Sequence, residues 1–529
     1  MRFILWLLAL GMIASPAQAD WYRADSENFV IFADDSEKDV ARFAEMLERY
    51  HAAMSFVTGR EVVTPSPSNR VTIYAVGSER TIRKLAGARN VGGFYMPRAG
   101  GSVAFVPDVR ASSGELDFSM ITLLHEYAHH FLIGSSRFAM PRWMDEGGAE
   151  FFASARFPRS GEVHIGRPAR HRAYELALAP EVSIHELFER GAMDRDEGNS
   201  RDNFYGRSWA LYHFLTFTPE RKGQLLDYAR KVAAGADSTK AAQDAFGDLK
   251  TLEDDLDRYL KKRKLLGFVL QPDLLPIRPI SVVRLSEGMD AMLPIIIRSK
   301  RGVDRETAQE VLADAREVAV AFPGDAGVLA ALAEAEFDAG HDDAAIAAAD
   351  AALAIDPAVK NALVQKGYAL FRKAADADDE DAAYAAAMEP FAALNALEQD
   401  HPLPLIYYYR SFVERGQAPS ENARHALERA AELSPFDHSL AMNAGVMQAR
   451  EGKIAIARRT LGPIAADPHG GGMARAAQAF LDDLSDVPEG TEWQPRRAVE
   501  LDEALATIAD EDDGEGGGED GEDDDGTED

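Results

Sequence analysis

The sequence predicts an α+β domain followed by an all-α solenoid of helical repeats. In residues 20–265, strand-like patterns come first and helical patterns follow, which is typical of α+β domains. In residues 301–485, prolines recur near a fixed period among alanine-rich helical segments, which is typical of stacked helix pairs. Between the two, residues 266–300 place several prolines among β-branched residues, and we predict a linker or a small β segment there.

Residues 1–19 have the pattern of a secretory signal peptide. Arg2 precedes an apolar run, and Ala17-Gln18-Ala19 matches the small-x-small cleavage site. The run is too short to span a bilayer comfortably, although an uncleaved N-terminal anchor is the alternative. No other apolar stretch of this kind occurs and the chain has no cysteine, so neither a membrane span after cleavage nor a lipid-anchored cysteine is expected. The sequence therefore predicts a periplasmic or secreted bacterial protein.

The charge of the chain excludes one class of partner. Its formal net charge is −31, whereas a nucleic-acid-binding protein needs lysine and arginine in excess to neutralise phosphates. The acidity is strongest at the C-terminus, where residues 510–529 contain only glycine, acidic residues and one threonine. Such a segment cannot bury a core, and we predict a disordered acidic tail over residues 486–529.

The first domain is predicted element by element from periodicity. Alternating or apolar runs indicate strands, and apolar residues at helical spacing indicate helices. A Pro-Arg-Ala-Gly-Gly stretch at residues 97–101 has the turn chemistry of a hairpin. The predicted elements are strands at 28–32 and 70–74, a helix at 38–56, a hairpin at 93–106, helices at 117–132 and 141–155, and wholly helical structure over 208–265.

The repeats have the period of tetratricopeptide repeats. Five prolines, each near the end of a helix pair, are separated by about 34 residues in three of four intervals. An acidic insertion near residues 376–381 explains the one long interval. The five are Pro323, Pro357, Pro402, Pro435 and Pro468. A plain alanine-rich helical bundle is the alternative. Because such solenoids present extended concave surfaces, we expect a protein partner to bind the repeats.

One motif carries chemistry. His125, Glu126 and His129 form an H-E-x-x-H pattern inside a helical segment, which places both histidines on one face, close enough to bind one metal ion. Glu126 points to the open side of that ion, where it can act as a general base toward a water molecule. His130 is rotated off the ligand face and is expected to be a packing or surface residue. Zinc usually takes a third protein ligand and leaves its fourth position open, and a downstream segment that contains Glu146 can supply the third.

The two segments together resemble the gluzincin metallopeptidases, in particular the peptidase-MA-like group. The resemblance rests on His-Glu-Tyr-Ala-His at 125–129 and on Trp-Met-Asp-Glu-Gly-Gly-Ala-Glu-Phe-Phe at 143–152, and covers roughly residues 20–265. It implies a zincin-like domain with Glu146 as the third zinc ligand and Glu150 as a carboxylate that orients a ligand imidazole. The reverse assignment of Glu146 and Glu150 stays open.

The same resemblance extends to a further segment and to the substrate. A downstream Tyr-x-x-Ser segment makes Tyr205 the candidate donor to the oxyanion, with Tyr212 and His213 behind it. An extended peptide is expected to bind along an edge strand, for which the 93–106 hairpin is the candidate.

We therefore expect a zinc metallopeptidase that hydrolyses a protein or peptide substrate, with repeats that bind a substrate or partner protein. The alternative is a scaffold that acts through its repeats and carries an inactive metallopeptidase-like domain. A purely structural zinc ion is a third option, which would usually need four protein ligands.

Overall fold

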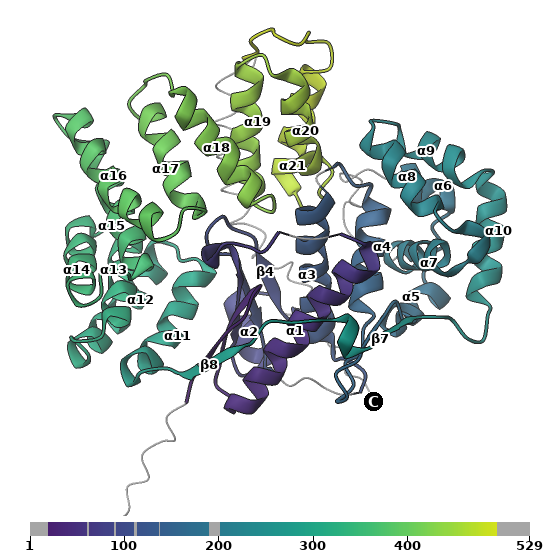
Figure 1. Ribbon diagram of the computed structural model, residues 1–529, viewed down its shortest axis with the longest axis horizontal. Coiled ribbons are helices and arrows are strands. Elements are labelled where there is room, and N and C mark those ends of the chain that lie inside the picture. The colour runs from purple at the N-terminus through teal and green to yellow at the C-terminus, as the bar shows by residue number, and fades with distance from the viewer. Residues whose placement is uncertain are drawn as a thin grey trace, which may run out of the picture.

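The computed structural model describes residues 20–60, 63–88, 91–109, 114–136, 138–189 and 202–494 (Figure 1). The predicted signal peptide and residues 495–529 of the predicted tail lie outside these residues. The described chain is mostly helical, with a strand-containing region near its N-terminus and a helical arc in its second half. None of the helices in these ranges is long and apolar enough to span a membrane.

The N-terminal region is built on a six-stranded mixed sheet in the order β4-β5-β3-β2-β1-β8. Its middle strands β2 (Phe29–Ala33), β3 (Val71–Ala75) and β5 (Val103–Val106) are parallel. At the edges, β4 (Phe94–Met96) and β8 (Ser281–Arg284) run antiparallel to their neighbours, and β1 (Tyr22–Asp25) pairs with β2 and β8. The predicted hairpin is confirmed as β4 and β5.

Helices cover both faces of this sheet, so the region is α/β rather than the predicted α+β. Helix α1 (Glu37–Thr58) is the crossover between parallel strands β2 and β3, and α2 (Glu79–Ala86) follows β3. Ile31 and Ile73 pack into the core shared with α1 and the next helices, whereas Tyr74 and Phe105 face α2 and α11 (Glu287–Arg301). Because both faces are covered, β2 and β5 read as continuous apolar runs, and the parallel pairing of the middle strands was not visible from the sequence.

Two helices carry the H-E-x-x-H motif and the segment that contains Glu146. Helix α3 (Phe118–Ser136) contains residues 125–129, and α4 (Arg142–Ala153) contains the second segment, as predicted. Helix α7 (Phe204–Phe217) crosses α4 so closely that a Cβ atom on Gly147 would lie 2.5 Å from the carbonyl oxygen of Ser208. Gly147 therefore permits the close packing of α4 on α7, and Gly148 is the glycine that faces Leu132 of α3.

The remaining helices of this region form a separate layer beside α4. They are α5 (Ala173–Leu178), α6 (Ile184–Glu189), α8 (Gln224–Ala233), α9 (Ser238–Phe246) and α10 (Leu249–Leu260). The described part of 208–265 is helical apart from short connections, as predicted.

Residues 266–300 contain two short strands and most of a helix that belong to the N-terminal region, which fits the predicted small β segment and not a linker. Strand β7 (Phe268–Leu270) pairs with β6 (Val163–Ile165), and β8 extends the main sheet beyond β1. Helix α11 then buries Leu293 and Ile297 against the sheet. These pairings join residues that are far apart in the sequence, so no local pattern could distinguish them from a connecting segment.

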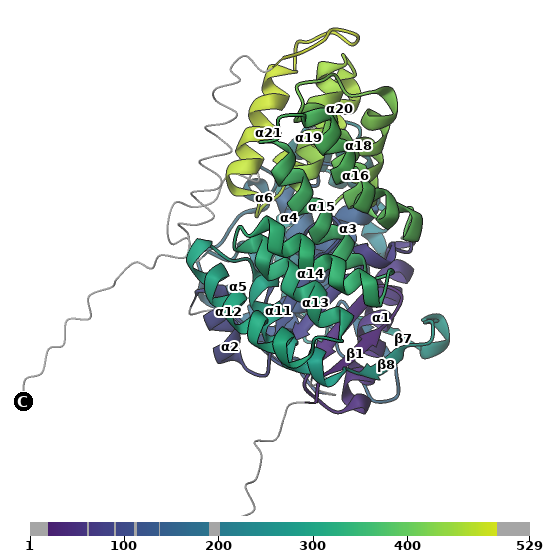
Figure 2. The same ribbon diagram turned by 90° about the vertical axis from the view of Figure 1, so that its left-hand side faces the viewer.

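The second half is an arc of antiparallel helices that curves from the sheet edge over α3 (Figures 1 and 2). The predicted prolines lie between or at the start of its helices. The acidic stretch at 376–381 lies largely in the connection between α15 and α16. The helices are α12 (Arg305–Ala321), α13 (Ala326–Asp338), α14 (Asp342–Ile355), α15 (Lys360–Ala374), α16 (Glu380–Leu397), α17 (Pro402–Val413), α18 (Glu421–Leu433), α19 (His438–Arg450), α20 (Ile454–Ala465) and α21 (Gly471–Asp483).

Residues 486–494, which the sequence assigned to the disordered tail, are ordered against the last helices. Trp493 is 6% exposed, its backbone N–H donates to Ala449 at 3.1 Å, and its ring meets Phe480 edge-on. The acidic composition of the predicted tail hid this apolar anchor, whose burial removes aromatic surface from water.

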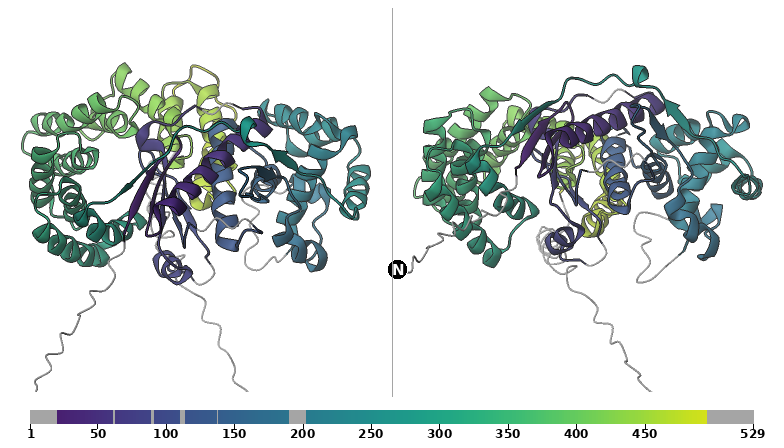
Figure 3. Two further views of the ribbon diagram at one scale, coloured as in Figure 1. Left: turned by 60° about the horizontal axis from the view of Figure 1, so that its bottom comes forward. Right: turned by 90° about the horizontal axis from the view of Figure 1, so that it is seen from below.

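The arc returns to the N-terminal region at its far end. Seen from below, the last helices lie beside α3 (Figure 3). Closer to the sheet, Ala99 at the hairpin turn donates its backbone N–H to Asp437 at 2.9 Å, and Phe436 packs on the His130 ring at 4.5 Å between centroids. Both contacts are made by the connection between α18 and α19, so the repeats cover the hairpin as well as α3.

Candidate metal centre

Helix α3 brings two imidazoles to one point. His125 and His129 lie one turn apart on the same face, and their Nε2 atoms are 3.0 Å apart. Both side chains are buried, because α3 is apolar on nearly all sides and packs against the sheet, α1 and α4. A hydroxyl from α1 holds the helix in place, since Tyr50 donates to the carbonyl oxygen of Leu124 at 3.0 Å.

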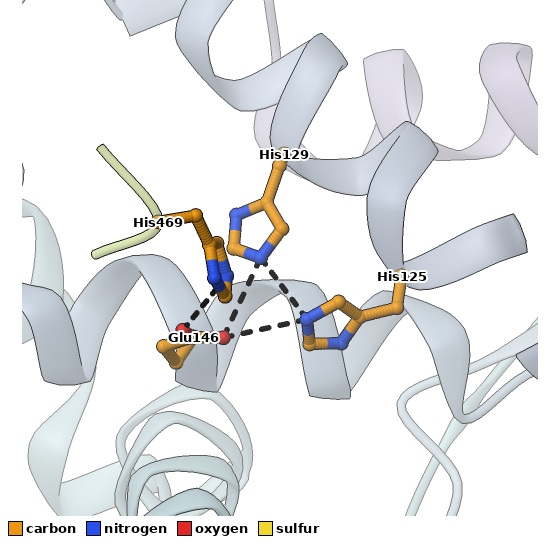
Figure 4. Close-up of side chains that lie close together, drawn as sticks. All are labelled: His125, His129, Glu146 and His469. Atoms are coloured by element: carbon orange, nitrogen blue, oxygen red, sulfur yellow. Dashed lines mark hydrogen bonds and ion pairs between the residues drawn. The ribbon is translucent and has the colours of Figure 1, made fainter. Parts of the chain in front are cut away.

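Helix α4 brings a carboxylate to the same point. The Oε2 atom of Glu146 lies 3.3 Å from His125 Nε2 and 3.4 Å from His129 Nε2 (Figure 4). Glu146 is fully buried, and neither of its oxygens makes a hydrogen bond of good geometry with any residue that the structure describes. Two adjacent ligands of a tetrahedral zinc ion, at about 2.0–2.1 Å from it, are about 3.3 Å apart. The three atoms have that spacing, so this donor set fits zinc.

A second carboxylate stands behind each imidazole. The Nδ1 atom of His125 lies 3.3 Å from Glu150, and that of His129 lies 3.0 Å from Asp145. Glu150 is itself fixed by His171 at 2.6 Å and by Arg172 at 2.6 Å. Carboxylates in this position hold a ligand imidazole in one tautomer and orientation and make it a stronger donor.

These carboxylates dominate the electrostatics of the group. Burial disfavours the charged imidazole of His125, but Glu146 and Glu150 outweigh it and raise its pKa to about 9. Burial likewise opposes the charge on His129, and Asp145 more than offsets it, which raises the pKa of His129 well above its ordinary value. For Glu146, burial is outweighed by the imidazoles, which hold its pKa well below the ordinary value. The site is therefore strongly polar although it is closed from bulk water.

A third imidazole comes from the repeats. His469, in the connection between α20 and α21, places its Nε2 atom 3.2 Å from Oε1 of Glu146, and its ring meets that of His129 edge-on (Figure 4). One ligand atom each from His125, His129, Glu146 and His469 lie within 4.8 Å of one another, so these four residues could hold a metal ion.

Sequence reasoning missed two members of this site. Asp145 was visible only as the acidic residue before Glu146, and nothing in its spacing distinguished it from a surface residue. His469 follows the last repeat proline, and its approach to α3 depends on the curvature of the whole arc.

The other predicted residues take different places. Glu126 lies outside the four-residue group but close enough to His469 to favour its charged form electrostatically. Tyr205 lies at the start of α7, where Arg172 packs over its ring at 4.7 Å. Burial, and after it the charge of Glu146, raises the pKa of Tyr205.

Three neighbours have structural positions. Tyr212 packs on Phe151, with ring centroids 5.2 Å apart. His213 is fully buried; its Nε2 atom bonds to the carbonyl oxygens of Gly166 and Leu266 and its Nδ1 atom to the hydroxyl of Tyr259. His130 lies off the ligand face and packs between β4 and the repeats, as expected.

The edge strand β4 is tied directly to α3. The hydroxyl of Tyr95 in β4 lies 2.6 Å from Nδ1 of His130. Burial lowers the pKa of His130 to about 3, so its neutral ring accepts a hydrogen bond from this hydroxyl. The hairpin predicted to bind an extended peptide therefore supplies an outer strand of the sheet, and this strand contacts α3 through Tyr95.

Comparisons with known proteins give little to set beside this geometry. Neither a protein-family model nor a curated protein matches the chain. Among the solved structures that match, two align with about two fifths of it. A tetratricopeptide-repeat protein from Thermus thermophilus is 11% identical, with a TM-score of 0.31, and the match covers 37% of this chain and 98% of that one. A structure described as "MamA RS-1 ArsTM double mutant" is 18% identical, with a TM-score of 0.27, and the match covers 38% and 98%. Scores this low do not by themselves establish a shared fold, and the helical repeats rest on the helices described above.

Proposed function

We propose that this protein is an exported zinc metallopeptidase of the gluzincin type, with a zincin-like catalytic domain and tetratricopeptide-like repeats that bind a protein substrate or partner. The observation that carries the proposal is the convergence of His125, His129 and Glu146 at 3.0–3.4 Å, with a carboxylate behind each imidazole. Two histidines one helical turn apart and a glutamate from a second helix are the ligands of catalytic zinc sites in metallopeptidases.

The residues divide the chemistry among them. His125, His129 and Glu146 would hold zinc, which supplies Lewis acidity for amide hydrolysis when it is bound. Glu126 accepts the proton of the attacking water on its carboxylate and passes it to the leaving amine. Glu150 and Asp145 would accept hydrogen bonds from Nδ1 of the two imidazoles, which turns each Nε2 toward the metal and fixes the orientation of each ring.

Substrate contacts are proposed from the elements around the group. An extended peptide would add as a further antiparallel strand to the outer edge of β4, which pairs with none of the described strands. Tyr205, at the start of α7, would donate its hydroxyl in a hydrogen bond to the oxyanion. The arc of repeats, which already contacts the hairpin at Ala99, would position the protein chain to be cut.

The test compares wild type with Glu126→Gln as purified full-length proteins. We expect both to bind one zinc ion by elemental analysis and only wild type to cleave a denatured protein and a peptide library. Glu79→Gln, an exposed glutamate on α2, is the matched control and should keep full activity. Hydrolysis retained by Glu126→Gln would exclude Glu126 as the base, and the absence of zinc from wild type would exclude the metal site.

Glu146→Ala distinguishes the third ligand from its neighbour. Zinc should be lost from this variant, because Glu146 is the carboxylate that reaches both imidazoles at Nε2. If its zinc content is unchanged and Glu150→Ala loses the metal instead, the two glutamates have exchanged roles.

The second candidate is a repeat scaffold with an inactive metallopeptidase-like domain. The observation that favours it is His469, because a fourth protein donor is what structural zinc sites have. In that case wild type binds zinc, cleaves nothing under any condition, and loses stability when the metal is removed.

A further inference from the structure

The connection between α20 and α21 carries the one donor of the metal group that does not belong to the N-terminal region. His125, His129 and Glu146 are buried on α3 and α4, whereas the His469 side chain is 49% exposed. His469 is followed by three glycines, and Gly471 has a φ of +48°, a conformation that costs glycine little. The His469 imidazole thus approaches the buried donors from the exposed side, and the glycines after it allow its backbone to change conformation at little cost.

We propose that His469 is a fourth metal ligand and that the last repeat is a built-in latch, which closes the metal site until the repeat moves away. The proposal rests on the proposed function, since it requires that the group hold zinc. A catalytic zinc site keeps one position for water or substrate, and a fourth protein ligand fills that position. The described structure is then the closed, inactive form of the enzyme.

The contacts of the connection show what would move with it. The backbone N–H of His469 donates to Asp467 at 2.8 Å, and the other oxygen of Asp467 lies 3.0 Å from His438 Nδ1 at the start of α19. His469 is therefore held in place by its own repeat. A displacement of α19–α21 would carry the imidazole away from α3 and α4 and would also separate Asp437 from Ala99.

The last repeat contacts the N-terminal region through a loosely packed surface that could separate. Gly462 of α20 faces Ala139 in the connection between α3 and α4, where a Cβ atom on the glycine would lie 3.6 Å from that of Ala139. A cavity of about 30 Å³ lies between the two surfaces, and Phe138, Asp145, His438 and Pro463 are among the residues that line it. Small side chains and a void give fewer dispersion contacts than a close-packed core.

A latch explains the arrangement better than a permanently closed structural site. The imidazoles of His125 and His129 each have a carboxylate at Nδ1. Glu126 follows His125 in the sequence, where it can act as a general base, and a structural zinc site needs no general base. A structural reading also predicts four equally buried ligands, whereas His469 is half-exposed beside a fully buried Glu146.

The first experiment replaces the fourth donor. Zinc affinity is measured by competition with a chelating dye, and the coordination sphere is followed through the visible absorption of the cobalt-substituted protein. For His469→Ala we expect a changed cobalt spectrum, zinc bound about tenfold more weakly, which is about 1.4 kcal/mol, and faster peptide hydrolysis. His425→Ala, an exposed histidine on α18, is the matched control and should behave as wild type.

The results separate this inference from the proposed function. If wild type and His469→Ala bind zinc equally and give the same cobalt spectrum, the latch is wrong and the three-ligand site stands. If neither protein binds metal, the metal site and the latch both fall. If His469→Ala melts far below wild type and stays inactive, His469 is a structural ligand.

The second experiment locks the latch without touching a ligand. Because the chain has no cysteine, Ala139→Cys with Gly462→Cys would form a single disulfide, and a Cβ–Cβ separation of 3.6 Å lies in the range of about 3.5–4.5 Å that disulfides have. We expect the oxidised protein to release zinc to a chelator more slowly and to cleave peptide more slowly than its reduced form. Equal rates in both forms would refute movement of the last repeat.

Discussion

Asp145→Asn tests whether charge behind a ligand imidazole strengthens this metal site. The Oδ1 atom of Asp145 lies 3.0 Å from Nδ1 of His129, and both residues are buried. Asparagine keeps the shape and the accepting oxygen but removes the charge that raises the pKa of His129. Losing such a partner typically costs about 10- to 100-fold in metal affinity. We therefore expect zinc binding to weaken by about 1.4–2.8 kcal/mol.

The assay is competition for zinc against a chelating dye, with an independent check of folding by thermal unfolding of the metal-free proteins. Glu162→Gln is the matched control, because Glu162 lies 3.1 Å from His164 in a pair outside the metal group. Its zinc affinity should equal that of wild type. A dissociation constant for Asp145→Asn within about twofold of wild type, in a protein that is folded normally, would refute the argument that this carboxylate tunes His129.

Three other positions give tests of packing, protonation and catalysis. Gly147→Ala puts a Cβ atom 2.5 Å from the Ser208 backbone, so α4 and α7 must separate. We expect a loss of about 1–3 kcal/mol in unfolding free energy and weaker zinc binding. The control is Gly134→Ala on α3, where a Cβ meets nothing within 4 Å, and it should be neutral or stabilising. Burial lowers the pKa of His213 to about 4 from 6.5, so the unfolded chain binds the extra proton between these values and stability falls as pH drops from 6.5 to 4. At about 1.36 kcal/mol per pH unit this contributes about 3 kcal/mol, and denaturant unfolding of His213→Gln should show a shallower pH dependence. Tyr205→Phe should lower kcat about 100-fold with little change in KM, if its hydroxyl meets the oxyanion, and steady-state kinetics with one peptide decide this.

The parts of the site that the sequence predicted are those set by local geometry. His125 and His129 share a face because the helix has about 3.6 residues per turn, and no tertiary information is needed to place them together. Glu146 needed more, since only the resemblance selected it over Glu150. The distances favour Glu146 as the ligand, because it approaches Nε2 of both imidazoles. Glu150 instead lies at Nδ1 of His125.

The parts that the sequence missed depend on pairings over long distances along the chain. Strand β8 joins β1 although some 260 residues separate Tyr22 from Arg284, so the sequence left residues 266–300 open between a linker and a small β segment. The parallel pairing of β2 with β3 is likewise a property of the crossover helix α1, and apolar runs alone fit an α+β order equally well. Trp493 shows the opposite error, in which an acidic neighbourhood concealed a buried anchor.

His469 is the most consequential of these misses, because it changes what the metal would do. If zinc is held by three residues of the N-terminal region and one of the repeats, the ion becomes a link between the two. Thermodynamic linkage then requires that any factor by which the docked repeat tightens zinc binding is also the factor by which zinc tightens docking of the repeat. A partner that pulls on the last repeat would therefore loosen the metal as it opens the site, and a metal-depleted protein would release the repeat more readily. Substrate recruitment, metal retention and access to Glu126 would be governed by one contact, that of His469 with the group around Glu146.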